Sequence, residues 1–194
     1  RKHRMKSRFT YKHTLYACYI GYITQAIINN LTPLLFVTFQ NRFDISLSQI
    51  GLLIFVNFGV QILVDSLGAK YADKIGHRNC MLLAHGFATA GLVLLAVLPG
   101  LMPNPYVGLL IATSVNAVGG GIIEVLVSPL CEALPLENKA SVMSMLHSFY
   151  CWGHVAVVLL STLFFVLTDE SVRLLLPVFW AVVPFLNLLL FLGV

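Results

Sequence analysis

Charged side chains are scarce in this chain of 194 residues, because Asp, Glu, Lys and Arg together make up only 10% of it. Soluble domains carry about 25% charged residues, so the composition excludes an ordinary soluble domain. Hydrophobic residues account for 58% of the chain, and the mean hydropathy is +0.87. These values predict an integral membrane protein.

Several catalytic and ligand-binding motifs are also missing. The sequence contains no phosphate-binding GxxxxGK[ST] or GxGxxG motif, no GxSxG motif of a serine hydrolase and no HExxH motif of a zinc enzyme. No CxxC pair is present, and the scattered cysteines are interpreted as free thiols within helices. We therefore expect no enzymatic activity, no cofactor and no metal site.

Long apolar stretches, each long enough to cross a bilayer, recur six times along the chain. They lie near residues 13–37, 48–67, 79–98, 106–130, 142–167 and 173–193. The loops between them are short, with no linker and no soluble domain. The sequence therefore predicts an all-α membrane protein in which residues 13–194 form a bundle of six transmembrane helices.

The positive charges are distributed unevenly between the two sides of the predicted bundle. Residues 1–12 carry six Lys or Arg, and the same side holds Lys70, Lys74, Arg78 and Lys139. The other side holds only Arg42 and Arg173. By the positive-inside rule both termini are predicted to be cytoplasmic. We interpret the basic segment 1–12 as a topology signal that contacts anionic membrane lipid, not as an arm that binds nucleic acid.

Polar residues form stripes at helical spacing inside four of the six predicted spans. Such stripes face a bundle interior or a wet cavity. The clearest one includes Glu124, a carboxylate deep in an apolar segment that follows three glycines. The stripes are Gln25 and Asn29; Asn57, Gln61 and Asp65; Asn116, Gly120, Glu124 and Ser128; and His147, Tyr150, Cys151 and His154.

An acid in hydrocarbon costs roughly 2.5–3.5 kcal/mol on insertion scales, so Glu124 is predicted to be functional. For Asn57, Gln61 and Asn116, hydrogen bonding between helices is an equally good interpretation. His147 and His154 can equally well be packing residues. His85 has no polar companion on its own helix face and is interpreted as structural. Asp65 is assigned to the cytoplasmic end of its span and is predicted to serve the adjacent loop.

The first and fourth spans share a pattern in which a polar residue shortly precedes a proline. Asn29 and Asn30 precede Pro33, and Glu124 and Ser128 precede Pro129. Corresponding breaks in two groups of three spans are typical of inverted repeats with discontinuous helices. The sequence thus predicts a 3+3 inverted repeat.

The loop between the second and third spans, GAKYADKIGHRN, resembles the signature of the major facilitator superfamily of transporters. The residues that match the signature are Asp73, Lys74, Gly76 and Arg78, whereas His77 replaces a basic residue and Ala69 stands at the position of a glycine. The resemblance implies a gating motif at facing helix ends. It also implies one half of a twelve-span fold, most similar to the N-terminal half, which needs a C-terminal half or a second copy as its partner.

Two further segments resemble the fucose permease-like branch of sugar/proton symporters. EVLVSP is similar to a Glu-x-x-x-Asn-Pro element, and in HSFYCWG the residues Phe149, Trp152 and Gly153 match that branch. The resemblance implies that Glu124 is a substrate or proton-coupling acid and His147 a substrate contact. Members of that branch carry an acid in the first helix where this chain has Asn29, which leaves proton coupling open.

The expected function is therefore secondary active transport of a small polar solute, with a sugar favoured, by alternating access across the cell membrane. The alternative is a non-transporting membrane subunit or receptor-like half that packs against a partner bundle. The residues expected to contact the substrate or couple a proton are Glu124, His147, Asn29, Gln25, Asn116, Tyr150, Trp152 and His154.

Overall fold

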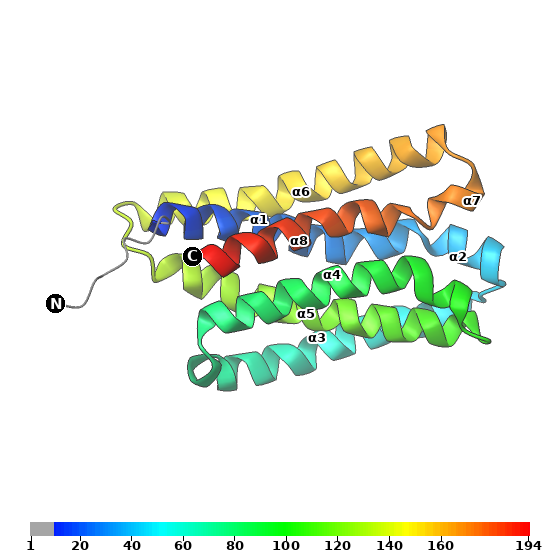
Figure 1. The fold of residues 1–194 in the computed structure, drawn as a ribbon, viewed down its shortest axis with the longest axis horizontal. Helices are drawn as coiled ribbons and strands as arrows, with labels where there is room; N and C mark the ends of the chain where they lie inside the picture. Colours follow the sequence, from blue (N-terminus) through cyan, green and yellow to red (C-terminus); the bar gives the residue numbers. More distant parts are fainter. Residues whose placement is uncertain (1–9) are drawn as a thin grey trace.

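The computed structural model describes residues 10–194, apart from the side chain of Ala69, and this part of the chain contains helices and no strand (Figure 1). Residues 1–9 of the predicted basic segment lie outside the described residues. The helices are α1 (Tyr11–Leu34), α2 (Phe36–Phe43), α3 (Leu47–Ile75), α4 (His77–Leu101), α5 (Pro105–Glu132), α6 (Lys139–Leu167), α7 (Glu170–Arg173) and α8 (Leu176–Gly193). The prediction of an all-α protein is confirmed.

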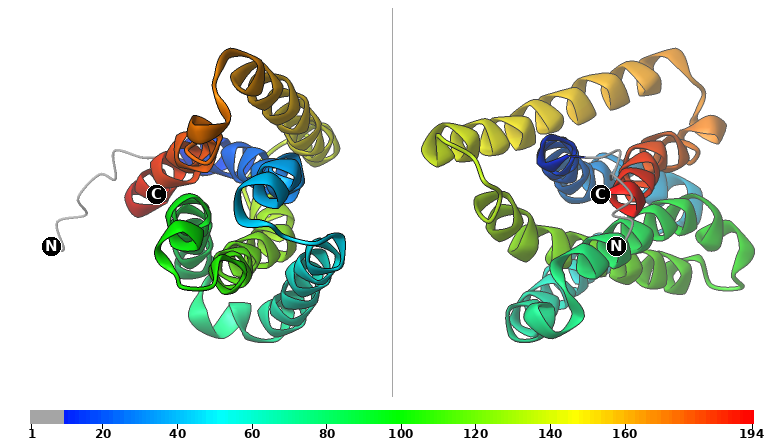
Figure 2. Two further views of the ribbon diagram at one scale, coloured as in Figure 1. Left: turned by 90° about the vertical axis from the view of Figure 1, so that its right-hand side faces the viewer. Right: turned by 60° about the vertical axis from the view of Figure 1, so that its left-hand side comes forward.

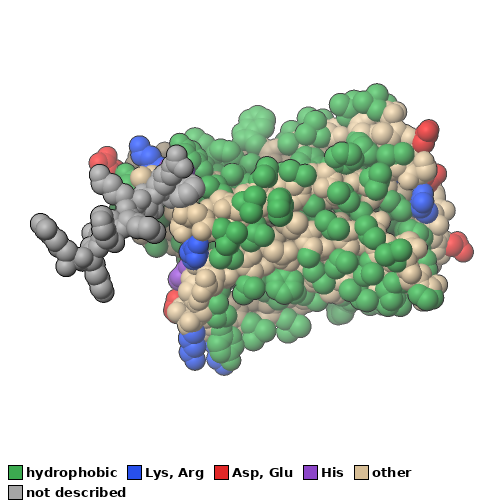
Figure 3. Space-filling model, in the orientation of Figure 1, with side chains coloured by type: hydrophobic (Ala, Val, Ile, Leu, Met, Phe, Trp, Pro, Cys, Tyr) green, Lys and Arg blue, Asp and Glu red, His purple; other side chains and the backbone are tan. Residues whose placement is uncertain are grey.

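The helices are long and apolar enough for a multi-pass membrane protein. Five stretches of the described residues qualify as spans by length and composition, and the number rises to six if the bent pair α1 and α2 counts as one. On the face shown in Figure 3, charged side chains gather at the two ends of the bundle and hydrophobic side chains cover the flank between them. That distribution matches a slab of hydrocarbon between two polar layers.

The first span is bent by 42° between α1 and α2. Pro33 lies in the last turn of α1 and has no N–H to donate to the carbonyl of Asn29, four residues earlier. Prolines are among the common causes of sharp helix kinks. The proline therefore removes the usual helical donor to the carbonyl oxygen of Asn29.

Helices α1 and α5 lie inside the bundle, whereas α3 and α6 lie at its edges (Figure 2). The main contact of α3 is with α5, and that of α6 is with α1. Helices α4 and α8 lie side by side, with α4 also against α5 and α8 against α1. This arrangement places the polar faces of α1 and α5 next to each other, on the side that α3 and α6 flank.

Two glycines allow α4 and α5 to approach closely. A Cβ atom on Gly91 of α4 would lie 2.5 Å from the Cα of Asn116, and one on Gly119 of α5 would lie 2.7 Å from the carbonyl oxygen of Ala84. Small residues at such crossings increase van der Waals contact, which holds helices together in lipid. The tight α4–α5 contact fixes the position of α5, the helix that carries Glu124.

Candidate functional site

Side chains from three helices line a polar hollow beside Glu124. Its volume is about 240 Å³. Helix α1 contributes three side chains, α5 one and α6 two. The lining residues are Tyr22, Gln25, Asn29, Glu124, His147 and Tyr150. Five of these belong to the residues that the sequence predicts for substrate or proton contact, and Tyr22 is the sixth.

The carboxylate of Glu124 is held by Gln25. The amide Nε2 of Gln25 donates a hydrogen bond of 3.1 Å to Oε2 of Glu124. Gln25 is only 2% exposed, and its Oε1 has no hydrogen-bond partner among the described residues. Because an ionised carboxylate only accepts hydrogen bonds, the Gln25 amide must present its nitrogen to Glu124. Its oxygen is therefore buried without a donor among the described residues.

The sequence places Glu124 deep in an apolar segment, but its side chain is not buried among the helices described. Glu124 is exposed, as is His147 across the hollow. The reason is topological, because the side chain points to the open face between α1, α5 and α6 and not toward α4. Hydropathy along one helix cannot show which of its faces a neighbouring helix covers.

Aromatic rings form one wall of the hollow. The Tyr22 ring lies 5.4 Å from the His147 ring and 6.3 Å from the Tyr150 ring, centroid to centroid. The Tyr22 hydroxyl is hydrogen-bonded to Oγ of Ser128 at 2.6 Å, so the ring is fixed from α5. Three ring systems and an acid around one small space provide both apolar faces and polar edges for a ligand.

Asn29 connects the hollow to both edge helices. Its Nδ2 donates to the Tyr150 hydroxyl at 3.4 Å, and its Oδ1 accepts from Nε2 of Gln61 at 3.3 Å. Both distances are long for hydrogen bonds, so the contacts are weak and can exchange for bonds to a ligand. Gly120 makes room for these amides, since a Cβ there would lie 3.0 Å from Nε2 of Gln61.

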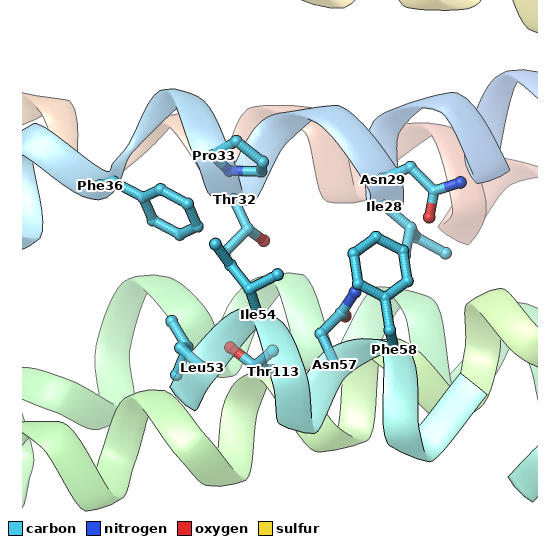
Figure 4. Close-up of a pocket in the computed structure, with 10 residues that line it drawn as sticks. All are labelled: Ile28, Asn29, Thr32, Pro33, Phe36, Leu53, Ile54, Asn57, Phe58 and Thr113. Carbon is cyan, nitrogen blue, oxygen red and sulfur yellow. The ribbon is translucent and has the colours of Figure 1, made fainter. Parts of the chain in front are cut away.

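A second hollow adjoins the first one at Asn29 and lies between α1 and α3 (Figure 4). Its volume is about 280 Å³ and its lining is mostly apolar. Side chains of α1 and α2 face those of α3 across it, with Thr113 of α5 at its back. The lining residues are Ile28, Asn29, Thr32, Pro33, Phe36, Leu53, Ile54, Asn57, Phe58 and Thr113.

Three of the predicted contact residues lie outside the polar hollow. Asn116 is 1% exposed and lies against Gly91 of α4. Each four-residue step along a helix turns it by about 40° beyond a full turn, so residues at this spacing do not keep the same direction. The stripe from residue 116 to 128 therefore drifts around α5. Trp152 is 71% exposed, and His154 is also exposed and does not line the hollow.

His85 has a polar partner that its own helix cannot reveal. Its Nδ1 lies 2.8 Å from the carbonyl oxygen of Met81, so this nitrogen carries the proton. Its Nε2 then accepts from Nδ2 of Asn187, at 2.7 Å, and the same amide donates to the carbonyl of Ala17 at 2.9 Å. This buried network agrees with the interpretation of His85 as structural, and its polar partner Asn187 comes from another helix, α8. The network ties α4 and α8 to α1.

The predicted gating motif forms the joint between α3 and α4. Gly76 is the single residue between the two helices, and its φ of +88° is a conformation that residues with a side chain rarely adopt. Arg78 donates to the carbonyl oxygens of Leu192 and Val194, at 2.6 and 2.8 Å, so it binds the last turn of α8. Asp73 and Lys74 are exposed, and the Lys74 ammonium lies 5.7 Å from the centroid of the Tyr71 ring.

Two polar residues of α3, Gln61 and Asp65, are not among the residues that the sequence predicts for substrate or proton contact. Gln61 is buried and reaches Asn29, as described above. Asp65 does not face the loop, because its Oδ1 lies 3.1 Å from the position of a Cβ on Gly121. Their shared stripe with Asn57 is the signal that could have located them. The described residues contain no cluster of three or more His, Cys, Asp or Glu side chains able to bind a metal.

A sequence model of one protein family matches most of the chain. The family is described as the Major Facilitator Superfamily, and the match covers residues 17–194. Comparisons with curated proteins and with solved structures found no match.

Proposed function

Because the chain belongs to the major facilitator superfamily, a family of membrane transporters, we propose that it binds a small polar solute in the hollow around Glu124 and carries it by alternating access. The observation that carries this proposal is the convergence of a carboxylate, two amides and three aromatic rings in one space. The family match gives no support to the alternative of a non-transporting subunit.

A sugar is the solute that this chemistry fits best. The Glu124 carboxylate is an acceptor for hydroxyl groups, and the rings of Tyr22 and Tyr150 offer faces for the apolar side of a pyranose. We propose a place in the fucose permease-like branch on the same grounds. We propose coupling to a proton gradient as part of this function, with Glu124, which lines the hollow, as the coupling carboxylate.

We propose that the six helices form a 3+3 inverted repeat and work with a second six-helix unit. The contact of α1 with α6 corresponds to the contact of α5 with α3 when the two groups of three spans are exchanged, which supports the repeat. Helices α3 and α6 are mostly exposed along the flanks of the hollow. A C-terminal half or a second copy covering these flanks would close the hollow, in a cell membrane with both termini cytoplasmic.

The test is uptake of a panel of labelled sugars into proteoliposomes that contain the full-length protein. Glu124→Gln keeps the size and removes the charge, so we expect at least a tenfold loss of uptake and of its pH dependence. Glu132→Gln is the matched control, since Glu132 is an exposed acid at the end of the same helix. Uptake by Glu124→Gln at the wild-type rate, with the wild-type pH dependence, would refute the proposal.

A further inference from the structure

The apolar hollow between α1 and α3 is a space that the proposed solute site leaves unused. Its volume is about 280 Å³, that of the polar hollow is about 240 Å³, and Asn29 lines both of them. Pockets that hold drug-sized ligands measure roughly 300–1,000 Å³. Each hollow alone falls below that range, whereas the two together reach it. A ligand that fills both hollows therefore has one polar part and one apolar part.

Two aromatic rings border the apolar hollow where the first span bends. Pro33 lines the hollow at the bend of 42° between α1 and α2. Phe36 comes from α2 and Phe58 from α3, and their rings lie in the space between these helices (Figure 4). Aromatic rings attract one another in edge-to-face and offset-stacked arrangements. The lining therefore favours an aromatic group as the apolar part of the ligand.

Thr113 supplies a polar group at the back of the apolar hollow. Its side chain is 2% exposed, and its Oγ1 has no hydrogen-bond partner among the described residues. Hydroxyl groups within spans often donate to the carbonyl oxygen four residues earlier, as those of Thr89 and Ser114 do. A buried hydroxyl without a partner is unfavourable. A polar substituent on the group that fills the hollow would supply this partner.

The two hollows differ in charge, and both are accessible. Among the described residues that line the apolar hollow none is charged, whereas the polar hollow contains the Glu124 carboxylate. A neutral group therefore suits the apolar hollow, and a group rich in hydroxyls suits the polar one. Ile54 and Phe58 are exposed, so the apolar hollow opens on the side of α3 that the described helices leave uncovered.

We propose that the solute is an aryl glycoside, a sugar joined through its anomeric oxygen to an aromatic ring. The sugar occupies the polar hollow, and the ring occupies the apolar hollow between Phe36 and Phe58. The oxygen that joins the two parts lies at Asn29, and a hydroxyl group on the ring binds Thr113. The inference rests on the transport function proposed above and narrows its substrate class.

The test measures the Kd of the purified full-length protein for matched methyl and phenyl glycosides of glucose, galactose and fucose. The phenyl glycoside of the preferred sugar should bind about tenfold more tightly than its methyl counterpart, because an aromatic ring leaves water for an apolar space. Ile54→Trp fills the hollow from its exposed side, so this advantage should disappear while the methyl glycoside still binds. Ile62→Trp is the matched control, the same exchange at an exposed position of α3 that lines neither hollow.

A second variant decides the matter if Ile54→Trp does not fold. Thr113→Val keeps the shape of the side chain and removes its hydroxyl, so it should abolish the preference of the wild type for the best hydroxyphenyl glycoside over the phenyl glycoside. That preference should be several-fold in the wild type. A preference of equal size in Thr113→Val would show that the ring substituent does not reach the hollow and would overturn the proposal.

The wild type alone can also overturn the proposal, if it binds the methyl and phenyl glycosides equally well. A phenyl advantage of the same size in folded Ile54→Trp would do so too, because the ring would then bind elsewhere. Binding and uptake of methyl glycosides without a phenyl advantage would refute only the aryl glycoside. A phenyl advantage that Ile54→Trp removes, without uptake of either glycoside into proteoliposomes, would refute only the proposed transport. Binding of neither glycoside would refute both.

Discussion

Gly91 is the position where a single added methyl group should disturb the bundle most, and Gly91→Ala tests the packing that places α5. A Cβ at this position would lie 2.5 Å from the backbone N and Cα of Asn116 and 2.7 Å from its Cβ. Carbon atoms in contact are normally about 3.5–4.0 Å apart. Helices α4 and α5 would have to separate by about 1 Å to accept the methyl group, since the nearest atoms belong to the backbone.

The expected loss follows from two opposing terms. Overpacking a tight contact costs about 1–3 kcal/mol, and alanine gains about 1 kcal/mol over glycine in a helix. We therefore expect Gly91→Ala to lower the free energy of unfolding by up to about 2 kcal/mol. Gly86→Ala is the matched control in the same helix, because a Cβ there meets no atom within 4 Å. It should be neutral or stabilising by up to about 1 kcal/mol.

Thermal unfolding of the full-length protein in detergent can be followed with a thiol-reactive dye. Cys18, Cys80 and Cys131 are buried and become reactive on unfolding, whereas exposed Cys151 is first replaced by serine. Gly91→Ala should melt up to about 8 °C below this background, and Gly86→Ala at or above it. Equal melting temperatures for the two variants would refute the close α4–α5 contact.

The remaining predictions concern the hollow and the buried network. Tyr22→Phe removes the hydroxyl that binds Ser128 and should lower stability by about 0.5–1.5 kcal/mol, measured by the same dye. Asn187→Ala leaves His85 without its donor and should cost about 1–3 kcal/mol; an unchanged melting temperature would contradict the network. Gly120→Ala brings a methyl group to 3.0–3.4 Å from two amides of the hollow and should raise the KM for uptake several-fold with little change in melting temperature.

The helices could be predicted from the sequence because hydropathy and turn residues act locally. The predicted fourth span, 106–130, lies within α5, and the predicted fifth, 142–167, lies within α6. The second span extends beyond its predicted end at residue 67 to Ile75, since its last two turns are polar and hydropathy does not include them. The bend after Pro33 follows from the chemistry of one proline.

The polar hollow could be predicted in part. A stripe of polar residues shows which face of a helix is polar, but it does not show which other helix packs against that face. Gln25, Asn29 and Glu124 are brought together as expected, and His147 and Tyr150 join them from α6. Asn116 belongs to the same stripe as Glu124 by counting, yet the drift of the helix carries it to α4. The partner of His85 is 102 residues away in sequence, beyond any local pattern.

The position of the Asp65 side chain could not be predicted from the sequence, because it depends on how two helices pack. Its sequence position favours the helix end and the adjacent loop, and only the approach of α3 to α5 places its carboxylate beside Gly121. From the sequence alone, the glycines at 119–121 can equally well be interpreted as residues that only let two helices pack closely. The role of GGG at 119–121 becomes visible only when the side chains of α1 and α3 are in place.

The central claim is that the hollow around Glu124 binds the transported solute, and equilibrium binding tests it most directly. The measurement is the Kd of the purified full-length protein and of Glu124→Gln for the sugar that gives uptake. A hydrogen bond to a charged group contributes about 1.5–3 kcal/mol, so the account predicts that the variant binds the sugar at least tenfold more weakly, while Glu132→Gln binds it like the wild type. An unchanged Kd for Glu124→Gln would contradict the claim.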